Sequence, residues 1–166
     1  MILNELWPLG PNITGYPGGF PNGFLQRMKK RGFLQEPILH VCSGSIKQGT
    51  TLDLEITTKP TICADAEQLP FDSETFQSVV IDPPYSKEKA LELYAKSLLN
   101  VPKAIKEAER VVKAGGFVSV LDLRVWQLGF ICKRLQWYAL IAIYTANRGP
   151  KPLRALQVFR KQESLP

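Results

Sequence analysis

The chain of 166 residues has a single histidine and three cysteines, too few and too scattered for a metal site or a disulfide framework. Cys42, Cys63 and Cys132 lack the paired spacing of either kind of site. We expect buried thiols in a reducing cytoplasm, and we expect no metal. His40 lies within an apolar stretch, where a core histidine is a better expectation than a catalytic base.

Long apolar runs, internal repeats and low-complexity segments are also missing. No apolar run reaches the roughly 20 residues that cross a membrane, and the first residues do not have the pattern of a signal peptide. Length and composition fit one domain over residues 1–166. The Pro- and Gly-rich residues 1–20 predict an irregular N-terminal segment. We therefore expect a cytoplasmic protein with no membrane partner.

Basic residues are in excess, with a formal net charge of +6. They gather in residues 27–31, 103–113 and 148–161. This balance favours nucleic acid as a partner, because Lys and Arg neutralise phosphates. The alternative for residues 29–31 is a solvated helix end, where cations interact favourably with the helix dipole.

Residues 78–85 carry the clearest functional signal. Residues 78–81 predict a buried parallel strand, which the prolines after Asp82 must end because proline has no N–H and a fixed φ. In open α/β sheets, ligands bind at the carboxyl ends of the strands. There Asp82 offers a carboxylate, Pro83 a carbonyl and Tyr85 a flat apolar face. This combination suits a planar group that carries an NH2.

The Asp82-Pro83-Pro84-Tyr85 sequence resembles the catalytic motif of the S-adenosylmethionine-dependent amino-methyltransferases, which methylate exocyclic amines of bases. The resemblance implies catalytic roles for all four residues. Asp82 and the Pro83 carbonyl would accept hydrogen bonds from the target amine, and Tyr85 would stack on the base. Acceptors that hold both N–H bonds favour a tetrahedral nitrogen and stabilise the charge that develops as the methyl group arrives.

Upstream segments resemble the cofactor motifs of the same family. In residues 37–45 a predicted strand precedes a small loop, where Gly44 would let the backbone approach the methionine part of the cofactor. This loop has one glycine and two serines where the family commonly has two or three glycines. Asp53 is implied for the ribose hydroxyls, with Glu55 as the alternative, and Asp65 for the adenine amine. The residues implied to bind S-adenosyl-L-methionine are Cys42, Ser43, Gly44, Ser45, Asp53, Asp65, Ala66 and Asp82.

The expected fold class is α/β. The resemblance implies a Rossmann-like class I methyltransferase sheet of about seven mostly parallel strands. Apolar stripes predict helices over residues 101–113 and 125–136. Residues 138–145 and 155–161 alternate in polarity and predict a C-terminal antiparallel hairpin.

The connections between the first three predicted strands are unusually short. Residues 43–50 and 56–61 leave less than the dozen or so residues that a parallel crossover normally takes. We expect the helices here to be reduced and part of the sheet to be exposed, so that a homodimer or a separate target-binding subunit would cover it. The exposed residues would be Ile38, Leu52, Leu54 or Ile62, or their neighbours in the strands.

The leading hypothesis is a methyltransferase that acts on an exocyclic amine of a nucleic-acid base, most simply adenine in DNA, with the base flipped or single-stranded. The hairpin loop would lie beside Asp82, so Arg148 and Lys151 are candidates for substrate binding, with a plain exposed loop as the alternative. DNA is preferred to RNA as the partner. Ribosomal or transfer RNA, a protein glutamine, a small aromatic amine and a non-catalytic subunit stay open as alternatives.

Overall fold

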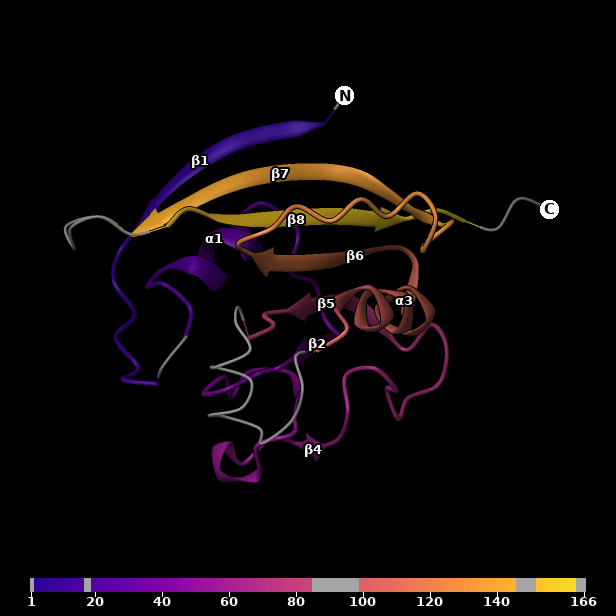
Figure 1. Ribbon diagram of the computed structural model, residues 1–166, viewed down its shortest axis with the longest axis horizontal. Helices are drawn as coiled ribbons and strands as arrows, with labels where there is room; N and C mark the ends of the chain where they lie inside the picture. Colours follow the sequence, from indigo (N-terminus) through magenta and orange to yellow (C-terminus); the bar gives the residue numbers. More distant parts are fainter. Residues whose placement is uncertain (1, 17–18, 85–98, 146–151, 164–166) are drawn as a thin grey trace.

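The computed structural model describes residues 2–16, 19–84, 99–145 and 152–163. In this part of the chain, eight strands form one sheet in the order β1-β7-β8-β6-β5-β2-β3-β4 (Figure 1). All neighbouring pairs are parallel except those that β8 makes with β6 and β7. The strands are β1 Leu3–Leu9, β2 Ile38–Val41, β3 Thr50–Asp53, β4 Ile62–Cys63, β5 Phe76–Ile81, β6 Val112–Asp122, β7 Leu135–Thr145 and β8 Arg154–Lys161.

The mostly parallel α/β sheet with an antiparallel C-terminal hairpin confirms the expected fold class. The alternating burial of β7 explains why its hairpin with β8 was visible in the sequence: Ala139, Ile141 and Ile143 are buried, and the residues between them are at least partly exposed. Such a period of two is typical of a strand with one covered face.

Two described α-helices cover opposite faces of the sheet. Helix α1 (Phe24–Lys30) packs Phe24 and Met28 against a cluster that contains Val80 of β5. Helix α3 (Val101–Val111) packs against a second cluster, which contains Val79 of the same strand. Successive strand residues point to opposite faces, so the two clusters are the two sides of one sheet. In the described part of the chain, neither helix has the length that a bilayer crossing requires.

The N-terminal segment corrects one prediction. Residues 1–20 were expected to be irregular, but Leu3–Leu9 form strand β1 and pair in parallel with β7. Trp7 and Leu9 alternate into the core and are 1% and 7% exposed. Pro8 is compatible with this strand because β1 lies at the edge of the sheet, where a missing N–H interrupts no second ladder.

The segment between β6 and β7 corrects a second prediction. Residues 125–136 were expected to be helical, but residues 123–134 run as bends and turns, and β7 begins at Leu135. The backbone N–H of Trp126 donates to the buried side chain of Gln157 (2.6 Å) instead of to a carbonyl of its own segment. Leu128 and Cys132 still turn inward, so the apolar stripe is real but is carried by an irregular chain.

The connections from β2 to β3 and from β3 to β4 lack α-helices, as expected, but the strands that they join are not left uncovered. Only a three-residue 3-10 turn, Ile56–Thr58, lies between β3 and β4, and no helix lies between β2 and β3. Ile38 and Leu52 are nevertheless 2% and 0% exposed, because α1 with Leu34 covers the first and the α3-side cluster encloses the second. Leu54 and Ile62 are half-buried. The expected exposure, which was the argument for a covering partner, is therefore wrong for Ile38 and Leu52 and only partial for Leu54 and Ile62.

Candidate functional site

The strand order reverses direction between β2 and β5. From β2 the chain continues outward to β3 and β4, and from β5 it continues the other way to β6. Loops that follow two such neighbouring parallel strands diverge and leave a crevice at the carboxyl edge of the sheet. Cys42 follows β2 and Asp82 follows β5, so both lie at this crevice.

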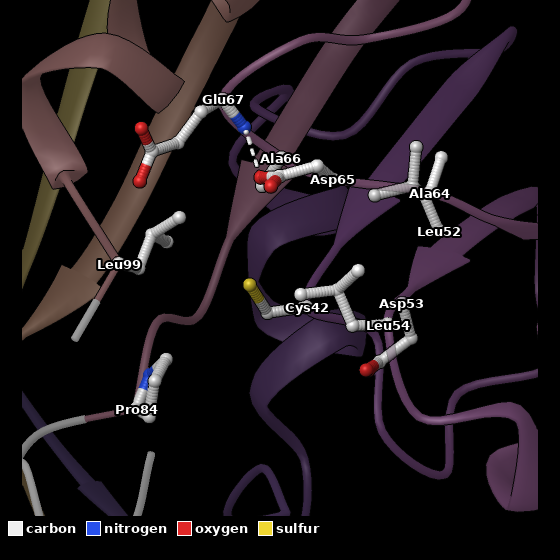
Figure 2. Close-up of a pocket in the computed structure, with 10 residues that line it drawn as sticks. All are labelled: Cys42, Leu52, Asp53, Leu54, Ala64, Asp65, Ala66, Glu67, Pro84 and Leu99. Carbon is white, nitrogen blue, oxygen red and sulfur yellow. Dashed lines mark hydrogen bonds between the residues drawn. The ribbon is translucent and has the colours of Figure 1, made fainter. Parts of the chain in front are cut away.

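A pocket of about 310 Å³ lies at this edge. Figure 2 shows Pro84 and Leu99 on one side of it, Asp53 and Leu54 on the other, and the Cys42 sulfur between them. Apolar walls with a few acids are typical of a site for a small molecule. The lining residues are Cys42, Leu52, Asp53, Leu54, Ala64, Asp65, Ala66, Glu67, Pro84 and Leu99.

Asp53 holds the loop after β2 in place. Its Oδ2 accepts a hydrogen bond from the backbone N–H of Gly44 (2.8 Å), and its Oδ1 accepts one from that of Glu55 (3.0 Å). Cys42 and Gly44 both have left-handed backbone conformations, with φ of 54° and 50°. This is uncommon for a residue with a side chain, so Cys42 is a strained residue at the pocket. Asp53 is 1% exposed and lines the pocket, whereas Glu55 does not line it.

The three expected acids act on one thiol. Burial raises the pKa of Cys42 well above its ordinary value, and the carboxylates of Asp53, Asp82 and Asp65 raise it further. The thiol therefore stays protonated and is not a nucleophile. Asp53 ends β3, Asp65 follows β4 and Asp82 follows β5. Asp53 and Asp65 line the pocket with Cys42, and Asp82 does not line it.

Asp65 and its neighbours form the wall that follows β4. The Asp65 carboxylate accepts from the backbone N–H of Glu67 (2.9 Å), which turns the chain after Ala66. Ala66 is buried, and the Glu67 carboxylate accepts from the backbone N–H of Asn100 (2.9 Å). That bond ties this wall to the start of α3, where Asn100 caps the helix by accepting from the Lys103 N–H (3.2 Å).

Strand β5 ends at Ile81, so the prolines after Asp82 lie outside the sheet, as the sequence predicted. The backbone N–H of Asp82 donates to the Val41 carbonyl at 3.3 Å, which continues the β2–β5 pairing to the end of the strand. Pro83 is buried, and Pro84 lines the pocket. Tyr85 lies outside the described residues, as do Arg148 and Lys151.

Tyr16 covers the loop that contains Gly44. A Cβ on Gly44 would lie 2.7 Å from Cε1 of the Tyr16 ring, so only glycine fits beneath this ring. Burial raises the pKa of Tyr16, and Asp53 and Glu55 raise it further. The Tyr16 hydroxyl is buried and has no hydrogen-bond partner among the described residues. Gly44 thus serves the approach of Tyr16, which the glycine pattern in the sequence did not reveal.

The two serines of the loop do not line the pocket. Ser43 is 6% exposed, and its backbone N–H donates to the Leu52 carbonyl (3.1 Å). Ser45 donates its hydroxyl to Thr14 at 3.3 Å, which fastens the N-terminal segment to the loop. Sequence reasoning missed the lining residues Leu52, Leu54, Ala64, Glu67 and Leu99. The signal for two of them was present, because Leu52 and Leu54 flank Asp53.

No family model matches the chain, and no curated protein matches it in sequence. Solved structures do match its fold. TrmN from Thermus thermophilus matches over 86% of this chain with 14% identity and a TM-score of 0.61. The chain spans about half of that protein, 49% of its length.

Two further solved structures match most of their own length as well. The N-methyltransferase NodS from Bradyrhizobium japonicum, in complex with S-adenosyl-l-homocysteine, is 13% identical, with 84% of this chain and 85% of NodS covered and a TM-score of 0.59. A SAM-dependent methyltransferase from Methanosarcina mazei is 14% identical, with 82% and 98% covered and a TM-score of 0.55. The fold is the Rossmann-like class I methyltransferase fold.

Proposed function

We propose that the protein is an S-adenosylmethionine-dependent methyltransferase that acts on an exocyclic amine of a nucleic-acid base. The observation that supports this most is that Asp53, Asp65 and Cys42 line one apolar-walled pocket, to which the turn after Asp82 contributes Pro84. The acids follow three strands whose carboxyl ends meet at the crevice of the sheet. Their positions relative to the strands agree with the motifs of the amino-methyltransferases.

The lining residues fit the cofactor chemically. Leu52, Leu54 and Ala66 offer an apolar wall for the adenine ring, while Asp53 and Asp65 offer acceptors for its ribose hydroxyls and its amine. The acids also favour the positive charge of a sulfonium. When bound, S-adenosylmethionine supplies an electrophilic methyl group. Asp53 retains acceptor capacity, because an ionised carboxylate has about four lone-pair sites and two are used by backbone N–H groups.

Asp82 and Pro83 would act on the target. The Asp82 carboxylate and the Pro83 carbonyl accept hydrogen bonds from the amine, which holds its nitrogen in line for attack and stabilises the developing charge. Tyr85 stacks on the base. A base within a duplex is out of reach of such a turn, so the substrate is a flipped or single-stranded base. Adenine in DNA is the first substrate that we propose, and RNA is the second.

Two measurements test this function. Calorimetry with S-adenosylmethionine should give saturable binding, which Asp82→Ala should leave nearly unchanged. Transfer of a tritiated methyl group should then be compared among single-stranded DNA, RNA of the same sequence and protein extract. Binding without transfer to any of them would indicate a non-catalytic subunit. Transfer to protein alone would contradict the nucleic-acid substrate.

A further inference from the structure

The chain that leaves β6 reaches the same edge of the sheet as the Asp82 turn. Ile81 of β5 pairs with Val120 of β6 in parallel. Two residues further along, Asp122 ends β6 at the carboxyl edge of the sheet, where the neighbouring β5 leads into the Asp82 turn. The residues after Asp122 emerge directly beside the catalytic turn, on the side away from β2.

Two buried polar side chains anchor this segment. Asp122 is 1% exposed, and its Oδ2 accepts a hydrogen bond from the indole N–H of Trp126 (2.8 Å). Gln157 of β8 is 0% exposed, accepts from the Trp126 backbone N–H (2.6 Å) and donates to the Arg124 carbonyl (2.9 Å). Buried polar groups that are satisfied in this way hold a loop in one conformation.

This anchoring leaves the side chain of Arg124 at the surface of the segment. Its guanidinium lies over the Trp126 ring, 4.7 Å from the ring centre, and its side chain is 49% exposed. Its Nε is 3.7 Å from Oδ1 of Asp122. Among the described residues, the structure gives the guanidinium no hydrogen-bond acceptor. Its two terminal nitrogens are therefore available to a ligand.

We propose that Arg124, supported by Trp126, binds a backbone phosphate of the nucleic-acid strand that carries the target base. The guanidinium fork matches phosphate oxygens, and the indole beneath it limits its movement, so little entropy is lost on binding. Phosphate contacts position a strand without reading its sequence. A phosphate beside Asp82 is where a strand that delivers one base to this turn must pass. The inference rests on the proposed function, for which it names a substrate contact.

The test is the binding of a fluorescently labelled single-stranded oligonucleotide, measured by anisotropy at several salt concentrations without cofactor. Arg124→Ala should weaken binding by about tenfold and reduce the salt slope by about 0.7, the value for one phosphate of a single strand. Arg124→Gln, which keeps a polar group near Asp122, should show the same loss. The matched control is Lys133→Ala, which removes one exposed charge at the opposite edge of the sheet.

An equal loss in Lys133→Ala would show a general charge effect and overturn the proposal, and so would unchanged binding in both Arg124 variants. The melting temperature of each variant identifies a loss that comes from unfolding. If methyl transfer fails while strand binding still depends on Arg124, only the proposed function fails. If the wild type transfers methyl groups while the Arg124 variants bind the oligonucleotide as tightly as the wild type does, only this inference fails.

Discussion

The two halves of the sheet differ in strand length and in how much of the pocket they line. Strands β2, β3 and β4 have four, four and two residues, whereas β6, β7 and β8 have eleven, eleven and eight. The short half supplies eight of the ten residues that line the pocket, all but Pro84 and Leu99. Short strands end early and turn their loops into the crevice, so this half supplies most of the pocket wall.

The long half carries most of the regular packing. Its residues Ala139, Ile141, Ile143, Leu156 and Val158 are all at most 1% exposed and belong to one cluster with β1 and α1. Both halves bury polar groups in their strands: His40, Thr51 and Asp53 in the short half, and Ser119, Asp122, Gln157 and Lys161 in the long half. Asp122, Gln157 and Lys161 are hydrogen-bonded, whereas the ring nitrogens of His40 have no partner among the described residues. Burying polar groups is costly unless they are hydrogen-bonded. The comparison therefore predicts that substitutions in the long half affect stability and that those in the short half affect binding and pH dependence.

Trp7→Ala should have the largest effect, because it tests whether β1 belongs to the long half. The indole is 1% exposed and packs in the cluster of β7 and β8. Loss of a buried Trp should lower the free energy of unfolding by about 3–5 kcal/mol in urea denaturation. Leu6→Ala is the control, since Leu6 is 58% exposed and should change stability by no more than about 0.5 kcal/mol. Similar values for the two variants would mean that β1 is not part of the core.

Asp82→Ala should separate catalysis from stability at the boundary between the halves. Methyl transfer should fall by about 100- to 1,000-fold, because the carboxylate acts mainly on the charge of the transition state. Cofactor affinity and melting temperature should stay near those of the wild type. The exposed Asp72→Ala is the control. Transfer by Asp82→Ala at more than about a tenth of the wild-type rate would be too fast for this role.

His40 should make the short half sensitive to acid. Burial lowers its pKa from 6.5 to about 4, and neither ring nitrogen has a partner among the described residues. The folded state therefore binds the proton more weakly than the unfolded state. Above pH 6.5, His40 is neutral in both states and does not affect the free energy of unfolding. As the pH falls from 6.5 towards 4, the unfolded state takes up the proton first, and the free energy of unfolding decreases by about 3 kcal/mol.

His40→Leu should remove this loss. The measurement is the free energy of unfolding at pH 7 and pH 4 for both proteins. Glu74 and Glu107, whose pKa values are lowered mainly by hydrogen bonds from Lys161 and Arg110, add their own acid sensitivity equally to both. An identical pH dependence in wild type and variant would show that His40 is not the titrating group.

Asp53→Ala should give the smallest of these effects, on cofactor binding. We expect a loss of about 1.5–3 kcal/mol, measured by calorimetry, because a carboxylate acceptor disappears and the Gly44 and Glu55 N–H groups lose their partner. Glu55→Ala is the matched control from the next turn of chain, since Glu55 does not line the pocket. A larger loss in Glu55→Ala would assign the ribose contact to Glu55.

Much of the short half was readable from the sequence because its signals are local. The Asp82-Pro83 step ends a strand by proline geometry alone, and Asp53 and Asp65 follow short apolar runs. Their positions at one edge follow from the parallel sheet. Tyr16 could not be placed in this way, because its contact with Gly44 joins residues 28 positions apart in the sequence.

The long half shows the opposite limit. Residues 125–136 have an apolar stripe that fits a helix, and the burial of Leu128 and Cys132 agrees with it. The backbone N–H of Trp126 donates to the side chain of Gln157, 31 positions away, instead of to a carbonyl within a helix. The pairing of β1 with β7 likewise joins residues separated by most of the chain. Neither the Gln157 hydrogen bond nor the β1–β7 pairing can be predicted from the few residues around each position.

By itself, the sequence determined which segments alternate or end, and thus the α/β class, the C-terminal hairpin and the acids at the strand ends. Backbone sterics and apolar periodicity act over a few residues, so they can be read directly. Only the tertiary structure decided that β1 completes the sheet, that Ile38 and Leu52 are covered, and that β6, which leads to Arg124, lies next to β5, which leads to Asp82. These depend on which distant surfaces bury one another, and that balance is set by the whole fold.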